Sequence, residues 1–386
     1  MGRTDCSQVS QQWVGLWEGL PDPRKARGIR HEWSVVLTLL AWGIGRGCTS
    51  VAAIGEMVRH QGDEIREVLG LGRERLPGTD TLRRALRMVD VESLEALAAQ
   101  LALRSMPNHV GSEGLRGHAI DGKAVRGAGR HGKSLCIVGR VEHETGRVLD
   151  QVEVDHKSNE ITAVPVLLAR SPAKNVVITM DALLTQRAIA QQIQATDSHY
   201  LMVAKDNQPR LLTSIAAHFL DAPSTLAIQS HHTLEKGHGR IERRVIEATA
   251  APQAWISWPG AKQVLRRTCT RRDVKSGKTT VCVSYGVTSL SPTTATPADL
   301  ERLWRHHWTI ENKTHYIRDV SMGEDACQVR TANAPRALTI LRNIVLNALK
   351  AGAWHSIPAA QRALAASVRF ALSFLGATLS AQPLPT

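Results

Sequence analysis

Apolar residues spaced three and four positions apart run through the first hundred residues of the chain. This spacing predicts helices, because it places the apolar side chains on one face of a 3.6-residue repeat. Glycine and proline separate the segments, as in the stretch LPGTD. The predicted helices cover residues 33–41, 51–59, 63–69, 80–88 and 91–104. We therefore expect an all-helical N-terminal domain over residues 1–105.

The pattern changes near residue 110 to short apolar runs with turn signals between them, which are typical of strands. Three such runs come first, and helical and strand-like segments then alternate. The predicted strands cover residues 115–121, 135–142, 148–154, 175–181 and 199–204, and the predicted helices cover 160–169 and 185–195. This order predicts an α/β fold, with a mixed sheet and flanking helices.

A β-rich insertion is predicted at about 225–295, where alternation returns in VCVSYGVTSL. Helix resumes at 297–318. Thr296 can cap this helix, and Pro297 and Asp299 in its first turn are typical start signals.

The last part of the chain is also predicted to be helical. A long helix is expected at 336–350, and residues 351–386 are expected to form a C-terminal helical tail. The expected middle domain thus covers residues 106–350 and contains the insertion.

The charge of the chain favours a polyanionic partner. Lys and Arg number 48 against 35 Asp and Glu, which gives a net charge of +13. A membrane is not the expected partner, since the longest apolar run, 33–45, is too short to span a bilayer and the N-terminus lacks a signal-peptide core. Nucleic acid is then the leading candidate.

The six cysteines are scattered, and none forms a CxxC pair. This is typical of a reducing compartment and gives no zinc site. We expect a cytoplasmic protein associated with the nucleoid.

Two acidic residues stand at the ends of predicted strands, and a third lies on a predicted helix. Asp121 ends HAID, Asp181 ends VVITMD, and Glu311 lies within the helix at 297–318. If the two strands are neighbours, their terminal carboxylates face one point. Carboxylates are natural ligands for a pair of hard divalent cations, which phosphodiester chemistry uses to activate a nucleophile and neutralise the phosphate.

The surroundings of Glu311 fit the same chemistry. Trp304, His307, Glu311 and His315 are three, four and four positions apart and share one helix face, with Arg318 one step further. Each acid alone has an ordinary explanation as a turn, cap or solvated residue. Because all three acids are placed together in this way, a site for phosphodiester chemistry is as strong a hypothesis as these ordinary explanations.

Several longer stretches resemble one known family. They are HAIDGKAVRGA, VDHKSNEITAVPVLL, VVITMDALLTQRAIAQQI, YLMVAKDNQPRL, GHGRIERR and HHWTIENKTHYIRDVSMGEDACQVR. Together they are similar to the H-repeat-associated, ISAs-type insertion-sequence transposases, a branch of the DDE transposases. Near the N-terminus, LPDPRKARGIRHEW and GTDTLRRAL resemble the accessory region of that family.

The resemblance implies an RNase H-like catalytic core, interrupted by the β-rich insertion before its last acid. It implies that Asp121, Asp181 and Glu311 are the catalytic triad and hold two Mg²⁺ ions, for which Mn²⁺ can substitute. The implied reaction is cleavage at the ends of a DNA element, followed by attack of the freed 3′-hydroxyl on target DNA. Double-stranded DNA is the implied partner, and the chain is expected to act on it as a homo-oligomer.

Basic and polar residues near the acids and in the insertion are candidates for DNA contacts, which give affinity and positioning. These candidates are Lys123, Arg126, Lys157, Asn159, Lys205, Asn207, Gln208, Arg240, Arg243, Arg244, His307, Asn312 and Arg318. Trp304 and Trp308 are candidates for stacking on a base, and core packing is expected for at least one of them.

Two alternatives stay open at this point. GAGRHGKS at 127–134 matches the P-loop pattern of nucleotide hydrolases, which requires a helix directly after Ser134. The following residues, LCIVGRVEH, favour a strand. The chain could instead be a non-catalytic, DNA-binding remnant of a transposase, which metal-dependent nicking would exclude.

Overall fold

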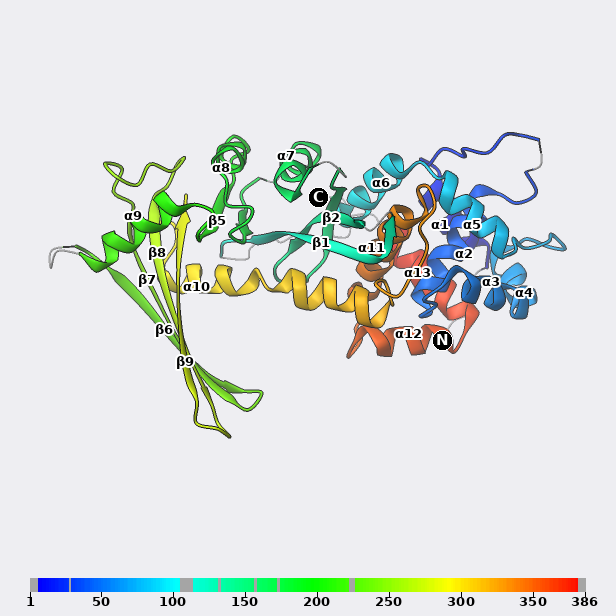
Figure 1. Ribbon diagram of the computed structural model, residues 1–386. Helices are drawn as coiled ribbons and strands as arrows, with labels where there is room; N and C mark the ends of the chain where they lie inside the picture. The colour runs from blue at the N-terminus through cyan, green and yellow to red at the C-terminus, as the bar shows by residue number, and fades with distance from the viewer. Residues whose placement is uncertain are drawn as a thin grey trace.

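The structure is a computed structural model that describes residues 6–27, 29–104, 114–130, 133–155, 158–171, 174–221 and 226–380. Helices gather at one end, a sheet crosses the middle, and long strands project at the other end (Figure 1). The result is a mixed α/β architecture with a helical N-terminal region, as the sequence predicts.

The N-terminal region consists of short helices that pack on one another. They are α1 (Cys6–Trp17), α2 (Trp33–Gly45), α3 (Val51–His60), α4 (Gly62–Leu69), α5 (Thr79–Met88) and α6 (Val91–Arg104). Five of these confirm the predicted helices to within a few residues, and α1 has no counterpart in the prediction. Almost every residue of α2 is buried, so this helix lies inside the helical core.

The last three helices join the same core. α11 (Ala334–Ala351), α12 (Ile357–Ala365) and α13 (Val368–Ser380) share one apolar cluster with the N-terminal helices. The Trp13 indole of α1 donates a hydrogen bond to the carbonyl of Leu372 in α13 at 3.0 Å. We call α1–α6 and α11–α13 the helical base. From the sequence, the N-terminal domain and the C-terminal helical tail are expected to be separate units, whereas their side chains form one core.

A nine-stranded sheet runs through the rest of the molecule in the order β3-β2-β1-β4-β5-β9-β8-β7-β6. Its strands are β1 (Gly117–Arg130), β2 (Lys133–Glu142), β3 (Val148–Glu153), β4 (Val177–Met180), β5 (His199–Ala204), β6 (Gln229–Gly237), β7 (Arg240–Ala250), β8 (Gln263–Asp273) and β9 (Thr279–Thr288). β4 lies parallel to both β1 and β5, and all other pairs are antiparallel.

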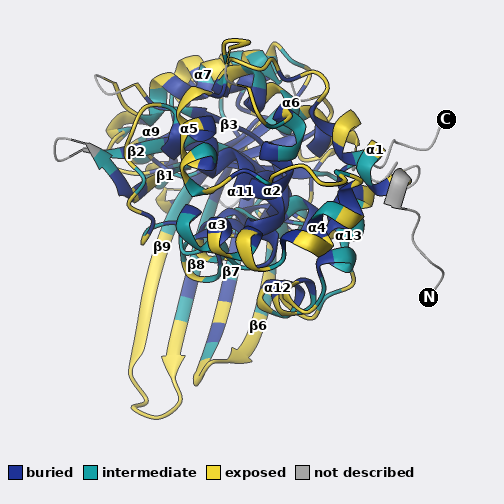
Figure 2. Cartoon of the chain, turned by 90° about the vertical axis from the view of Figure 1, so that its right-hand side faces the viewer, coloured by how far each residue is buried: buried dark blue, intermediate teal, exposed yellow. Residues whose placement is uncertain are grey.

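The predicted β-rich insertion corresponds to β6–β9. Its last strand, β9, pairs with β5, so the insertion extends the central sheet instead of forming a separate unit. The outer ends of its two hairpins are exposed and stand clear of the body (Figure 2). We call β6–β9 the projecting strands.

Helices cover both faces of the sheet. α7 (Glu160–Arg170), α8 (Arg187–Gln194) and α9 (Pro209–Leu220) pack on one face, and α10 (Pro297–His306) packs on the other. Thr296 and Asp299 form a capping box at the start of α10, as the start signals predict. The predicted helix at 297–318 then continues with π-type hydrogen bonding in η1 (Glu311–His315) and η2 (Ile317–Ser321).

The P-loop alternative is wrong, because the described residues of its segment lie on two neighbouring antiparallel strands, β1 and β2. Arg130 at the end of β1 pairs with Lys133 at the start of β2, and Ser134 continues along β2. No helix N-terminus follows, so the backbone amides that bind phosphate in a P-loop are not presented. Within the described ranges, moreover, none of the helices combines the length and apolarity that a bilayer span requires.

Candidate active site

The parallel pairing of β1 with β4 brings the first two acids together. Ile120 pairs with Met180, so Asp121, the next residue of β1, lies beside Asp181, the first residue after β4. Adjacent strands are about 4.8 Å apart. The expectation that the two strands are neighbours is therefore confirmed.

Asp121 is half-buried and receives a hydrogen bond from the backbone N–H of Gly122 at 2.9 Å. Burial raises the pKa of Asp121 to about 7, and the negative charges of Asp181, Glu160 and Glu311 also raise it. The hydrogen bond from Gly122 acts in the opposite direction and lowers this pKa. A cation at this place would favour the ionised carboxylate.

Asp181 begins the loop that follows β4. One of its oxygens accepts hydrogen bonds from the backbone N–H groups of Leu183 at 3.0 Å and Leu184 at 3.5 Å. The loop is anchored from β5, because the Thr185 hydroxyl donates to the Val203 carbonyl at 2.7 Å. The position of Asp181 is thus set by its own loop and by the neighbouring strand.

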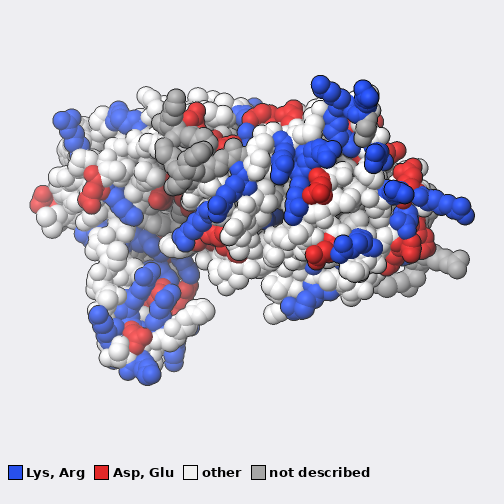
Figure 3. Space-filling view, turned by 45° about the vertical axis from the view of Figure 1, so that its right-hand side comes forward, with Lys and Arg blue, Asp and Glu red and all other residues white. Residues whose placement is uncertain are grey.

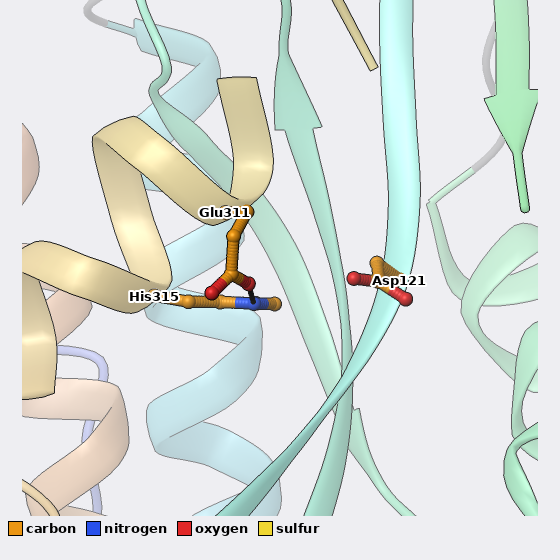
Figure 4. Close-up of side chains that lie close together, drawn as sticks. All are labelled: Asp121, Glu311 and His315. Atoms are coloured by element: carbon orange, nitrogen blue, oxygen red, sulfur yellow. Dashed lines mark hydrogen bonds and ion pairs between the residues drawn. The ribbon is translucent and has the colours of Figure 1, made fainter. Parts of the chain in front are cut away.

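Glu311 and His315 reach the same place from the opposite side (Figure 4). One ligand atom from each of Asp121, Glu311 and His315 lies within 4.8 Å of the others. The His315 Nδ1 is 3.0 Å from a carboxylate oxygen of Glu311. Burial lowers the pKa of His315 to about 3, and the nearby charges of Arg318 and Lys123 act in the same direction, so the imidazole is neutral and able to bind a metal.

All three acids line one cavity of about 470 Å³ between the central sheet and the projecting strands. Positive side chains contribute to its wall, namely Lys205, Arg267 and Arg271. Trp304 is in the core, whereas Trp308 is 63% exposed beside the cavity. The expectation that at least one of these indoles packs in the core is therefore confirmed by Trp304.

Among the polar candidates, Lys205 and His307 lie at the cavity. The His307 Nδ1 is 3.1 Å from the Thr179 hydroxyl, and burial lowers its pKa. Lys123 and Arg318 do not face the cavity. The Lys123 ammonium lies 2.6 Å from Asp319, and the Arg318 guanidinium lies 2.7 Å from the fully buried Glu324.

Three further candidates hold loops in place. Asn159 caps α7 by accepting from the Ile161 N–H at 3.1 Å. Asn207 donates to the Ala182 carbonyl at 2.6 Å, and Gln208 donates to the Thr185 carbonyl at 2.9 Å. Asn207 and Gln208 therefore support the loop of Asp181.

The remaining candidates are spread over the surface and the projecting strands. Arg126, Arg243 and Asn312 are exposed, Arg240 pairs with Glu242 at 2.6 Å, and Arg244 is buried between Glu235 and Glu242. Lys157 lies outside the described residues. Figure 3 shows Lys and Arg side chains gathered over the projecting strands, at its lower left.

Sequence reasoning missed Arg267 and Arg271 as cavity residues. They lie four positions apart on β8, so they point to the same face of the sheet. Their alternation is visible in LRRTCTRRD, but the sequence does not show which face meets the acids. Arg267 pairs with Glu301 of α10 at 2.7 Å, which identifies that face.

Comparison with known proteins gives matches along most of the chain. A family described as "Transposase DDE domain" matches residues 111–348, and one described as "DDE_Tnp_1-associated" matches residues 16–102.

Individual relatives of this chain are also named as transposases. "Putative transposase YncI" of Escherichia coli O157:H7 is 30% identical over 86% of this chain and 85% of its own length. "H repeat-associated putative transposase YhhI" of Escherichia coli (strain K12) is 28% identical over 86% of this chain and 88% of its own length. The solved synaptic complex of piggyBac transposase with hairpin DNA aligns with a TM-score of 0.42 and 10% identity over 96% of this chain and 79% of that chain, too low to establish a shared fold.

Proposed function

The chain belongs to the family of DDE transposases, among the H-repeat-associated insertion-sequence transposases, and we propose that Asp121, Asp181 and Glu311 are its catalytic carboxylates. The observation that carries this proposal is that these three acids, about 60 and 130 positions apart in the chain, line one cavity. A carboxylate trio gathered by folding matches what metal-dependent phosphodiester chemistry requires.

The donor set suits divalent cations. Carboxylates and a neutral imidazole surround the point where Asp121, Glu311 and His315 meet. Among the described residues, no Lys or Arg forms an ion pair with Asp121 or Asp181, so their negative charge lacks a direct counterion. When bound, Mg²⁺ or Mn²⁺ neutralises charge on the phosphate and lowers the pKa of a bound water.

We infer that the fold around the acids is an RNase H-like core. The support is the strand order β3-β2-β1-β4-β5, with the first acid on the central strand, the second after β4, and the third on the helical segment that follows the insertion. The proposed catalytic domain covers residues 106–350, with the insertion at about 225–295. Residues 1–105 are the proposed accessory domain, and residues 351–386 the C-terminal helical tail.

The residues around the cavity would bind and orient DNA. Lys205 offers positive charge to phosphates at the cavity, and Trp308 offers an exposed ring beside the acids. Arg267 and Arg271 also line the cavity, each paired with an acid, Glu301 and Glu242 respectively. In the proposed first step, water attacks a phosphorus atom at an element end, and the bond to the 3′ oxygen breaks. The freed 3′-hydroxyl then attacks a target phosphodiester, whose own 3′ oxygen departs.

We propose double-stranded DNA at the nucleoid as the partner. One chain offers one trio of acids, whereas an element has two ends. A homo-oligomer would therefore supply one cavity for each end.

The proposal is tested with Asp121→Asn, Asp181→Asn and Glu311→Gln. Each removes a negative charge and keeps the shape of the side chain. Cleavage of DNA carrying the element ends should fall by about 10³-fold or more in Mg²⁺ or Mn²⁺. Glu56→Gln, on the exposed surface of α3, is the matched control.

DNA affinity, measured by fluorescence anisotropy in EDTA, should change less than about threefold in these variants, since their role is in the chemistry. Normal cleavage by any one variant removes that residue from the trio. A wild-type chain that binds the ends but never nicks them would identify the non-catalytic remnant.

A further inference from the structure

A fourth carboxylate, that of Glu160, lies close enough to Asp121 and Asp181 for their charges to act on one another, and has no assigned role. Glu160 is the first residue of α7, directly after the capping residue Asn159. A Cβ atom built on Gly122 would lie 2.0 Å from the Cδ of Glu160, and 2.1 and 2.4 Å from its two oxygens. The Glu160 carboxylate therefore occupies the space that any larger residue at position 122 would need.

This carboxylate is in electrostatic contact with the other acids. Its charge contributes to raising the pKa of Asp121, and burial followed by the charge of Asp181 raises the pKa of Glu160 itself. No hydrogen-bond donor and no Lys, Arg or His partner contacts the Glu160 carboxylate within the described ranges. A half-buried carboxylate beside other carboxylates is costly unless a cation is present.

Glu160 approaches from the face of the sheet opposite to Glu311. Along β1, Ala119 packs with Ile310 on one face, whereas Ile120 packs with Val164 of α7 on the other. By strand alternation, Asp121 faces the side of Glu311 and position 122 faces α7. The acids thus surround the end of β4 from both sides of the sheet.

Resting on the proposed function, we propose that Glu160 is a fourth carboxylate of the divalent-cation centre, contributing to it from the α7 side. Gly122 leaves open the space that this carboxylate occupies next to Asp121 along β1. The motif SNE at the start of α7 then has two roles, since Asn159 caps the helix and Glu160 supplies the charge. If Glu160 had a purely structural role, its removal would not change cation binding. Cation binding therefore distinguishes a structural role from a role in the cation centre.

The test is binding of Mn²⁺ to the full chain without DNA, by isothermal titration calorimetry. Glu160→Gln should weaken Mn²⁺ binding by about tenfold or more, or reduce the number of bound ions from two to one. Glu56→Gln is the control for removing a charge. The Mn²⁺-induced rise in melting temperature should shrink in parallel in Glu160→Gln, because ligand stabilisation follows affinity.

A second variant probes the same contact from the other side. Gly122→Ala places a methyl group where the Glu160 carboxylate lies and should also weaken Mn²⁺ binding. Gly237→Ala on β6, where nothing lies within 4 Å of the added Cβ, should not. Melting without metal identifies any variant that fails to fold.

The outcomes separate this inference from the proposed function. If Glu160→Gln binds Mn²⁺ within twofold of wild type while Asp121→Asn does not bind, the role of Glu160 is refuted and the catalytic trio stands. If Asp121→Asn also binds normally, the metal centre itself is wrongly placed. A wild-type chain that binds no Mn²⁺ contradicts both.

Discussion

The helical base and the projecting strands are built in opposite ways. The base contains the largest apolar cluster in the described part of the chain, to which both ends of that part contribute. The outer ends of β6 and β9 are exposed on both faces, and large apolar side chains such as Leu234 and Val281 lie there among arginines (Figure 2). Burial stabilises the first region, whereas the second leaves apolar and charged side chains on its surface.

The candidate active site lies between these two regions. Asp121 and Asp181 come from the central sheet, whereas Arg267 and Arg271 reach the cavity from the projecting strands. A DNA strand bound along the projecting strands would therefore meet the acids where these strands join the central sheet. Substitutions in the two regions should accordingly affect different properties, namely stability in the base and DNA affinity in the projecting strands.

The largest contrast is expected between two leucines. Leu341 is fully buried in α11, so Leu341→Ala should lower the free energy of unfolding by about 2–5 kcal/mol. Leu234 is 73% exposed, so Leu234→Ala should change it by less than about 0.5 kcal/mol. Urea unfolding of the two variants measures both values. Equal losses would mean that the projecting strands are buried in solution, for instance against a second chain.

A smaller loss is expected for Arg318→Ala. Removing Arg318 leaves the fully buried Glu324 with Arg342 at 3.4 Å and the more distant charge of Lys123. The free energy of unfolding should fall by about 2 kcal/mol, less than for a buried ion left with no partner. DNA affinity of the folded variant should stay within twofold of wild type. A tenfold drop in affinity with unchanged stability would restore the DNA contact that the sequence predicts for Arg318.

The smallest effect is expected for single arginines of the projecting strands. Arg243→Ala and Arg272→Ala remove exposed charges, so each should weaken DNA binding about threefold and reduce the salt dependence of the binding constant by about one charge. Stability should not change. Arg59→Ala, exposed on α3 of the base, is the control. If Arg59→Ala weakens DNA binding as much as the other two, the proposed division between the regions is wrong.

The elements that sequence reasoning predicted are those with strong local patterns. The strand ending at Asp181 is a continuous apolar run, and the helix after Thr296 carries its cap, proline and acid in order. The helices α1 and α9 have no counterpart in the prediction. α1 is buried only through contacts with distant parts of the chain such as Leu372, which no local pattern reveals.

The candidate site was likewise predictable only where local patterns mark its residues. The three acids could be chosen from strand ends and a helix face, and they do converge on one cavity. The roles of basic residues could not be read in this way, because a guanidinium or ammonium looks the same in the sequence whether it faces solvent or a buried acid. Lys123 is paired with Asp319, nearly two hundred residues away in the chain.

By itself, the sequence of this protein determined most of its local elements, its family and the choice of three candidate acids, because each depends on residue order over short stretches. Only the tertiary structure decided which distant segments meet. It joined both ends of the described chain in one base, continued the insertion into the central sheet, and placed Glu160 against Gly122. These outcomes depend on strand register and on packing between faces, which are properties of pairs of segments and are not written in either segment alone.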